Sequence, residues 1–285
     1  MAVGERAVTT ETPPASLLVN AADADVTLRI VPAGKRKPID VLVRTLRSER
    51  ALRYRDWVRR NREYVTARSK GATGYVHVRD MEGSGLAEFF RGFRSQSRRN
   101  GLIVDVRNNN GGWVSQIVLE HLCRRVIGYE RPRYGAPTPY PVDAVRGPIV
   151  VLCDQWTASD GDVFCHAFKA YGLGPLIGRR TWGGVVGVSV DDYLADGTVV
   201  TQPQYNLYFE TIGGRIENHG VEPDIEVDVP PGSSLDPQLD RAVVEIRSRL
   251  SEAPAIEPWW SEKTERRPAV RRRKASGKKR NPKRP

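Results

Sequence analysis

One serine of this chain stands where a hydroxyl can act as a nucleophile. Residues 149–153 form a short apolar run that predicts a buried strand, and residues 163–171 have a helical pattern. Ser159 therefore falls where a strand gives way to a helix. Such a junction can expose a hydroxyl while backbone N–H groups point at an incoming oxyanion. The alternative is a helix cap, in which Ser159 or Asp160 binds the first free N–H groups of the helix.

Two glycine-rich segments could supply backbone groups around such a site. The first, residues 110–112, follows a predicted buried strand at residues 101–106, and its paired glycines let N–H groups approach a ligand without side-chain obstruction. The second, residues 182–187, contains Gly183 and Gly184 and could lay a flat strand edge against an extended peptide. An ordinary turn and an ordinary loop are the alternatives for these two segments.

An acid and a histidine stand close together further along the chain. Glu217 and His219 are two residues apart within the segment 213–224, between glycine turns. Because side chains alternate along an extended backbone, both would share one face if this segment is extended.

Alternating strands and helices must position these motifs. Strands are predicted at residues 74–78, 101–106 and 149–153, and each is followed by a helical pattern. This alternation implies crossover connections and a largely parallel sheet. From residue 176 onward the pattern turns to strands, and a helix is predicted at residues 236–250.

The chain divides into four predicted parts. Residues 1–46 have the pattern of a small β domain that ends in a hairpin, and residues 47–72 hold a charged helix that links two domains. The motifs all lie in a core domain at residues 73–250. Residues 251–285 are rich in Pro, Lys and Arg and are predicted to be a disordered basic tail.

Composition limits the classes of protein to consider. The chain has 285 residues and a net charge of +11, of which +10 lies in residues 262–285 (12 basic, 2 acidic), so the rest is nearly neutral. No apolar run is long enough to span a membrane, and no secretory signal is visible at the start. Three scattered cysteines have no metal-type spacing, which favours reduced thiols in a cytoplasmic protein without a metal or other cofactor.

Four sequence runs, in this order, resemble the tricorn type of the tail-specific (C-terminal-processing) serine peptidase family. They are GLIVDVRNNNGG, YPVDAVRGPIVVLCDQWTASDGD, LIGRRTWGGVVG and IENHGVEPD. The resemblance implies an α/β fold with a crotonase-like core, in which flanking helices cover a mixed sheet, preceded by a partial PDZ-like β domain. It also implies a serine endopeptidase that forms cytoplasmic homo-oligomers and acts on oligopeptides.

The resemblance assigns roles to individual residues. Ser159 matches the family's nucleophile, and Gly112 and Asp160 match the residues whose backbone N–H groups form the oxyanion hole. Glu217 matches the acid of the charge network, and Glu130 matches an acidic position that selects a basic residue beside the scissile bond. Apart from the resemblance, Gly183 and Gly184 of the glycine-rich segment are expected to bind substrate. Asn110 replaces a glycine of the family's triple-glycine turn.

The family's general base is a histidine that lies ahead of the PDZ domain, and no such segment is recognised in this sequence. The chain resembles an N-terminally truncated member, and the proton acceptor is expected to come from a separate chain or to be missing. Its own four histidines are His77, His121, His166 and His219. Of these, His219 is nearest to Glu217 in sequence and is the candidate for a replacement base.

Two other classes of function remain open from the sequence. A peptidase remnant could bind peptides, or act as a scaffold, at the strand edge of residues 182–187 and at Glu130, without cleaving them. The basic tail could bind nucleic acid, although a solvated charged tail explains the same composition.

Overall fold

The computed structural model describes residues 1–233, 235–258 and 260. The chain forms two compact units, Met1–Tyr64 and Val65–Pro285. The greater part of the predicted basic tail, residues 261–285, lies outside the described residues. The basic residues that could bind nucleic acid belong to this part. None of the described helices is long and apolar enough to cross a bilayer.

The first unit is a small antiparallel sheet. Its strands β1 (Ala2–Val3), β2 (Arg6–Ala7), β3 (Asp25–Ile30) and β4 (Ile39–Arg44) are arranged in the order β2-β1-β3-β4. The hairpin of β3 and β4 is the one predicted from their alternating pattern, and α1 (Pro14–Leu17) is a single turn. Val3 and Leu17 are the buried apolar side chains of this fully described unit, so its core is small. Helix α2 (Arg50–Arg68) follows.

A five-stranded sheet forms the centre of the second unit. It contains β5 (Thr73–His77), β6 (Gly101–Asp105), β9 (Ile149–Cys153), β10 (Leu176–Gly178) and β13 (Ile225–Glu226), in the order β13-β10-β9-β6-β5. Each pair of neighbouring strands is parallel. The predicted parallel sheet is therefore present, but the mixed sheet expected from the family resemblance is not found here. A segment between two consecutive strands must therefore cross from the end of one strand back to the start of the next, so that both strands run in the same direction.

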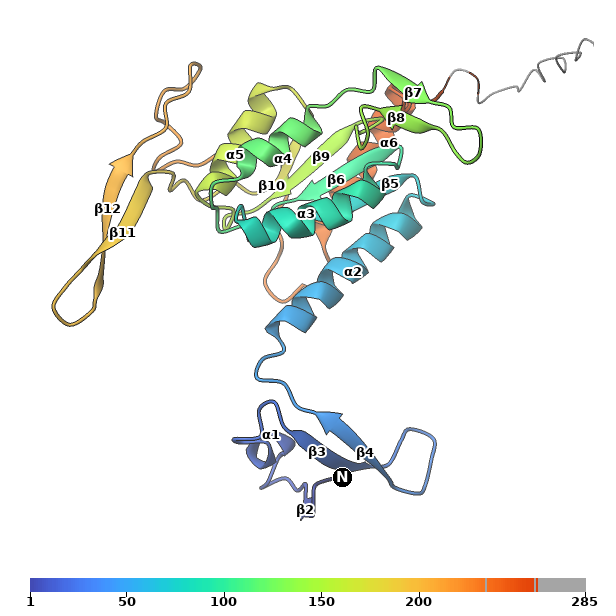
Figure 1. Ribbon diagram of the computed structural model, residues 1–285, viewed down its shortest axis with the longest axis vertical. Helices are drawn as coiled ribbons and strands as arrows, with labels where there is room; N and C mark the ends of the chain where they lie inside the picture. Colours follow the sequence, from blue (N-terminus) through green and yellow to red (C-terminus); the bar gives the residue numbers. More distant parts are fainter. Residues whose placement is uncertain (234, 259, 261–285) are drawn as a thin grey trace, which may run out of the picture. The chain divides into compact units, whose positions relative to one another are not determined.

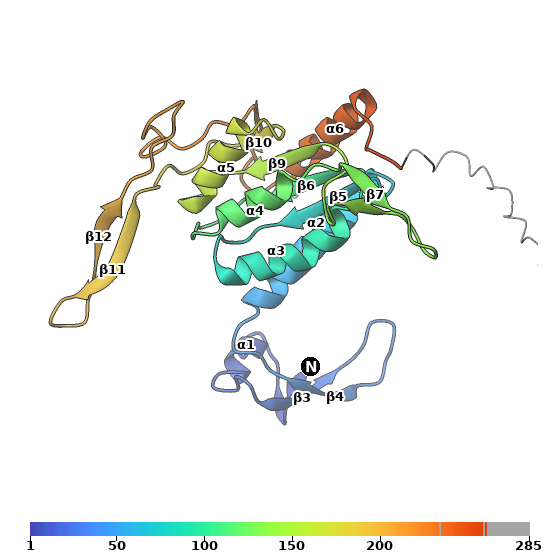
Figure 2. The ribbon, with the colours of Figure 1, turned by 45° about the horizontal axis from the view of Figure 1, so that its top comes forward.

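Helices cover both faces of this sheet (Figures 1 and 2). Helices α3 (Gly83–Gln96), α4 (Ser115–Leu122) and α5 (Asp160–Ala170) lie on one face and α6 (Pro237–Glu252) on the other. On the first face, buried residues such as Phe93, Val118 and Phe164 pack against alternate strand residues in one core cluster. Strand residues are buried on both faces, which explains the continuous apolar runs in the sequence.

Two antiparallel ribbons stand apart from the sheet. The ribbon of β7 (Gly128–Glu130) and β8 (Thr138–Tyr140) and the hairpin of β11 (Gly187–Tyr193) and β12 (Val199–Tyr205) lie on opposite sides of the second unit in both views (Figures 1 and 2). The antiparallel strand pairs of this unit thus form separate ribbons and are not part of the central sheet.

Candidate active site

Ser159 occupies a sharp junction between β9 and α5. Its backbone has φ 55° and ψ −119°, a conformation that residues other than glycine rarely adopt. Ser159 holds the N-cap position of α5, but its side chain makes no cap hydrogen bond. Its hydroxyl has no hydrogen-bond partner among the described residues, and the residue is half-buried. The cap interpretation of this serine is therefore wrong, because the hydroxyl is left available for other chemistry.

A network of buried polar groups holds the junction in this conformation. The Asp154 carboxylate accepts hydrogen bonds from the backbone N–H of Asn108 at 3.0 Å and of Trp156 at 3.1 Å. The Thr157 hydroxyl lies 2.9 Å from the carbonyl oxygen of Val106 at the end of β6. These bonds connect the turn after β9 to the turn after β6. Together they fix the backbone conformation close to the serine and allow its unfavourable torsion angles to persist.

The glycine turn after β6 lies directly against Ser159. A Cβ atom on Gly111 would lie 2.5 Å from the Cβ atom of Ser159 and 2.9 Å from the backbone nitrogen of Asp160. A Cβ atom on Gly112 would lie 2.1 Å from the carbonyl oxygen of Met81. Both glycines also have positive φ, of 86° and 144°. Glycine is required here by close approach and by conformation, so this is more than an ordinary surface turn.

Asn109 fixes the glycine turn from inside. This fully buried side chain donates from Nδ2 to the Val78 carbonyl at 2.7 Å and accepts from the Gly111 N–H at 2.9 Å. The Asn109 carbonyl accepts from the Ala158 N–H at 2.8 Å, one residue before Ser159. Sequence reasoning missed Asn109. Its position among three consecutive asparagines gave no sign of which one is buried.

Two backbone donors remain unused at this contact. In the part of the chain that the structure describes, the N–H groups of Gly112 and Asp160 have no hydrogen-bond partner. The Asp160 carboxylate is engaged instead by Ser115, from its backbone N–H at 2.9 Å and its hydroxyl at 2.5 Å. Asp160 thus joins the starts of α4 and α5 through its side chain, while its N–H stays free. Free N–H groups beside a serine are what a developing oxyanion requires.

The segment with Gly183 and Gly184 runs across the start of α5. The Trp182 N–H donates to the Thr157 carbonyl at 2.9 Å, and the Gly183 N–H donates to Asp162 Oδ1 at 2.9 Å. Asp162 is fully buried, and burial raises the pKa of its carboxyl group. Asp162, a residue that sequence reasoning missed, holds this segment close to Ser159. In the sequence, Asp162 is only the last residue of the run that ends in TASDGD, and nothing there marks it as buried.

Glu217 holds the same segment from its other side. Its Oε2 atom accepts hydrogen bonds from the backbone N–H groups of Val185 at 2.6 Å and Val186 at 2.9 Å. The Asn218 N–H also donates to the Gly183 carbonyl at 2.6 Å. The structure therefore brings together Ser159, the glycine turn and the segment 182–186, with Glu217 as a partner of that segment's backbone.

His219 does not share a face with Glu217. The segment around them is a series of turns rather than an extended strand, because the N–H groups of His219 and Gly220 both donate to the Ile216 carbonyl. The exposed His219 ring has Nε2 3.7 Å from the Glu222 carboxylate. The expectation of an acid–histidine pair on one face is therefore wrong.

The other histidines are engaged elsewhere. Buried His77 has Nε2 3.0 Å from the Arg107 carbonyl oxygen, and burial lowers the pKa of its ring. His121 has Nδ1 2.8 Å from the Ile117 carbonyl oxygen. The His166 ring packs 4.4 Å from the ring of Phe209, measured between centroids.

Glu130 is placed away from these segments. It is exposed and ends β7, in the ribbon on the side of the unit opposite the hairpin that continues from the segment 182–186 (Figure 1). Its Cα partner is Thr138 of β8. No group of side chains with a metal-binding arrangement is present in the described residues.

The site geometry and the comparisons with known proteins both indicate a serine peptidase. Residues 72–227 match the model of Peptidase family S41, and the chain belongs to this family of serine peptidases. It is 44% identical over 261 residues to tricorn protease homolog 1 of Streptomyces coelicolor. This match covers 90% of this chain and 24% of that protein. It is 48% identical over 240 residues to a Sulfurisphaera tokodaii protein described as a tricorn-like protease C-terminal subunit, covering 83% of this chain and 28% of the relative.

A solved structure agrees with these relatives. The crystal structure of the tricorn protease matches with a TM-score of 0.84 and 42% identity, over 87% of this chain and 24% of that one. The chain thus spans about a quarter of the length of the proteins it matches.

Proposed function

We propose that this chain carries the catalytic part of a tricorn-type serine endopeptidase, with Ser159 as its nucleophile. One observation carries the proposal: a strained serine with an unengaged hydroxyl lies against a glycine turn. The N–H groups of Gly112 and Asp160 would bind the oxyanion formed when the Ser159 Oγ attacks a peptide carbonyl. The amine product then leaves, and water releases the acyl group from Ser159.

Glu217 would act in this mechanism through the backbone. Its hydrogen bonds to Val185 and Val186 keep the segment 182–186 in place. That segment, with Gly183 and Gly184, would in turn hold an extended peptide by its backbone.

A serine hydroxyl needs a proton acceptor to be nucleophilic near neutral pH. The rings of the chain's four histidines are engaged with other groups, as described above. We therefore propose that the base comes from another polypeptide segment. The relative described as a C-terminal subunit supports a peptidase divided between chains.

Cleavage after basic residues is proposed from Glu130. Since Glu130 lies in a ribbon away from the Ser159 segments, it would serve the site of a neighbouring copy in a homo-oligomer. We also propose a crotonase-like core at residues 73–250, a PDZ-like domain at residues 1–46 and a linker helix at residues 47–72. The four-stranded antiparallel sheet and α2 support the last two. A cytoplasmic location is proposed from the free thiols of the three cysteines.

The experiment measures hydrolysis of a fluorogenic oligopeptide with Arg before the reporter group. The chain is assayed alone and mixed with the part of the Streptomyces coelicolor relative that lies outside the match. We expect turnover in the mixture, and its loss by a factor on the order of 10⁴ or more in Ser159→Ala. Ser248→Ala on α6 is the matched control and should keep full turnover, because its hydroxyl bonds only to Glu252 on the surface.

Other outcomes would decide against parts of the proposal. Turnover by the chain alone that disappears in Ser159→Ala would mean that a base lies within it. Undiminished turnover by Ser159→Ala in the mixture would reject Ser159 as the nucleophile. A chain that binds the peptide but is silent in every mixture would be a peptide-binding scaffold.

A further inference from the structure

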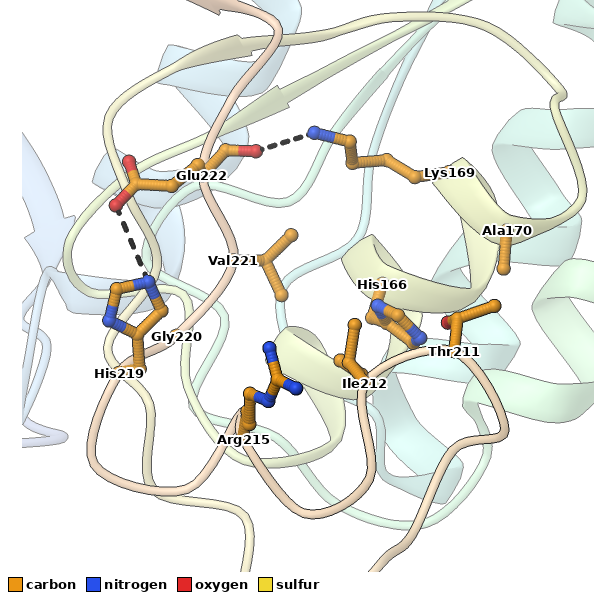
Figure 3. Close-up of a pocket in the computed structure, with 10 residues that line it drawn as sticks. All are labelled: His166, Lys169, Ala170, Thr211, Ile212, Arg215, His219, Gly220, Val221 and Glu222. Carbon is orange, nitrogen blue, oxygen red and sulfur yellow. Dashed lines mark hydrogen bonds and ion pairs between the residues drawn. The ribbon is translucent and has the colours of Figure 1, made fainter.

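A cavity of about 500 Å³ lies outside the Ser159 site, between α5 and the loop 211–222 (Figure 3). His166, Lys169 and Ala170 line it from α5, and the loop contributes the facing wall. Much of that wall is apolar, with Ile212 and Val221 at its centre. Glu217 belongs to the same loop but does not line the cavity, because its carboxylate turns to Val185 and Val186.

Most charged groups of this cavity are already compensated. Lys169 Nζ lies 2.9 Å from the Asp224 carboxylate and donates to the Glu222 carbonyl at 2.8 Å. The Glu222 carboxylate lies 3.5 Å from Arg180 Nε and 3.7 Å from His219 Nε2. These pairs balance each other at the rim, so they leave little net charge of their own.

Arg215 is the exception. Its guanidinium has no hydrogen-bond or ion-pair partner among the described residues, and it points toward Val221 across the cavity (Figure 3). His166 adds polar ring nitrogens beside Ile212, and its pKa is lowered by burial and by Lys169, which favours the neutral ring. The cavity therefore combines one uncompensated positive charge with apolar walls.

We propose that this cavity binds the C-terminal end of a peptide, with the α-carboxylate on Arg215 and the last apolar side chain against Ile212 and Val221. A planar guanidinium offers two parallel N–H donors that match a carboxylate. A single carboxylate also balances the single free charge, while the apolar walls suit an aliphatic side chain. Hydrolysis of a peptide bond creates one new α-carboxylate, so a peptidase of this family supplies such ligands itself.

The inference rests on membership in a peptidase family and not on the role of Ser159. The test therefore uses the Ser159→Ala chain, in which turnover cannot complicate binding. Fluorescence anisotropy follows three labelled pentapeptides that end in a free Val carboxylate, in Val amide, or in Glu amide. The first has the α-carboxylate, the second has none, and the third has a carboxylate only on its side chain.

We expect the free acid to bind at least about tenfold more tightly than the Val amide, since a charge-assisted contact is lost. A second substitution, Arg215→Gln, should remove this preference, and Arg215→Lys should keep only part of it. Arg247→Gln, at an exposed position of α6, is the matched control and should bind as the parent chain does. Because Arg215 and Arg247 are both exposed, neither change should impair folding.

Three results would overturn the proposal. Equal binding of the free acid and the Val amide would exclude a carboxylate site. A preference that survives in Arg215→Gln would place the site elsewhere. Binding of the Glu amide as tight as that of the free acid would assign the cavity to acidic side chains rather than to peptide ends. None of these results bears on Ser159, which the hydrolysis assay tests separately.

Discussion

Gly111 and Ser159 are in direct contact, although they belong to turns that follow different strands. A Cβ atom on Gly111 would lie 2.5 Å from the Cβ atom of Ser159, a separation that no side chain can accept without movement. The two turns meet because β6 and β9 are parallel neighbours, so their carboxyl ends reach the same edge of the sheet.

Gly111→Ala should therefore reduce turnover much more than it reduces stability. The added methyl group must displace Ser159 or the backbone of Asp160, and a shift of about 1 Å costs on the order of 100-fold in rate. The positive φ adds strain of about 1–3 kcal/mol. Peptide hydrolysis in the mixture described above and urea unfolding of the chain alone measure the two effects. Gly135→Ala is the matched control, with φ 98° and nothing within 4 Å of its added Cβ. It should lose some stability and keep its turnover, and an equal loss of turnover in both variants would contradict the steric argument.

Glu217→Ala should loosen the segment 182–186 without unfolding the chain. Two backbone N–H groups lose a charged acceptor, and such bonds contribute about 1.5–3 kcal/mol each. Hydrogen exchange at the amides of Val185 and Val186 should accelerate by roughly tenfold to 100-fold. Exposed Glu210→Ala on the same loop region is the control and should leave both amides unchanged. Unaltered exchange in Glu217→Ala would show that other contacts hold the segment.

Asp105→Asn should strongly destabilise the fold. Asp105 is fully buried, and its carboxylate accepts two bonds from the Arg107 guanidinium, at 2.7 and 2.9 Å. Removing its charge leaves a buried guanidinium without its main partner, which costs about 3–5 kcal/mol. Urea unfolding at pH 7 measures the loss. The exposed pair of Arg29 and Asp40 has the same two-bond geometry, so Asp40→Asn is the matched control and should change stability little.

The same substitution should change the response to acid. Burial by itself raises the pKa of Asp105, but the charge and hydrogen bonds of Arg107 outweigh burial and leave the pKa below its usual value. A lowered pKa in the folded state means stability that is present above the unfolded pKa of about 3.9 and is lost as pH falls through the folded value. The native chain should show this loss below about pH 4, and Asp105→Asn should not. Parallel pH curves for the two chains would count against it.

On acidification, His77 should lower stability at a higher pH than Asp105 does. Burial lowers the pKa of His77 and outweighs the neighbouring Asp105 and Asp154, which favour the charged ring. The unfolded state thus binds a proton that the folded state does not, and stability decreases below pH of about 6.5 by up to about 1.4 kcal/mol per pH unit. Urea unfolding between pH 8 and 5 should show a flatter slope for His77→Gln. An unchanged slope in His77→Gln would contradict this prediction.

The sequence predicts the framework of the site better than its side-chain network. The strands before Ser159 and before the glycine turn are continuous apolar runs bounded by turn residues, and both were placed correctly. The contact between Gly111 and Ser159 follows once the sheet is parallel. Helix α6 was also placed within two residues at each end.

Contacts that depend on loop conformation could not be predicted in this way. Residues 205–209 have a strand-like composition, yet β12 ends at Tyr205, and turns begin at residue 210. The same turns separate Glu217 from His219, because alternation applies only to extended backbone. The ribbon of β7 and β8 was missed because three-residue strands carry too few residues to show a period.

The φ of 55° at Ser159 sets stability against activity at a single position. Glycine would adopt this conformation without strain, so Ser159→Gly should raise the free energy of unfolding by about 1 kcal/mol while abolishing hydrolysis. A more stable chain is thus one substitution away, and selection for folding alone would favour it. A serine at this position therefore carries a cost in stability, which the proposed role of its hydroxyl as the nucleophile would explain.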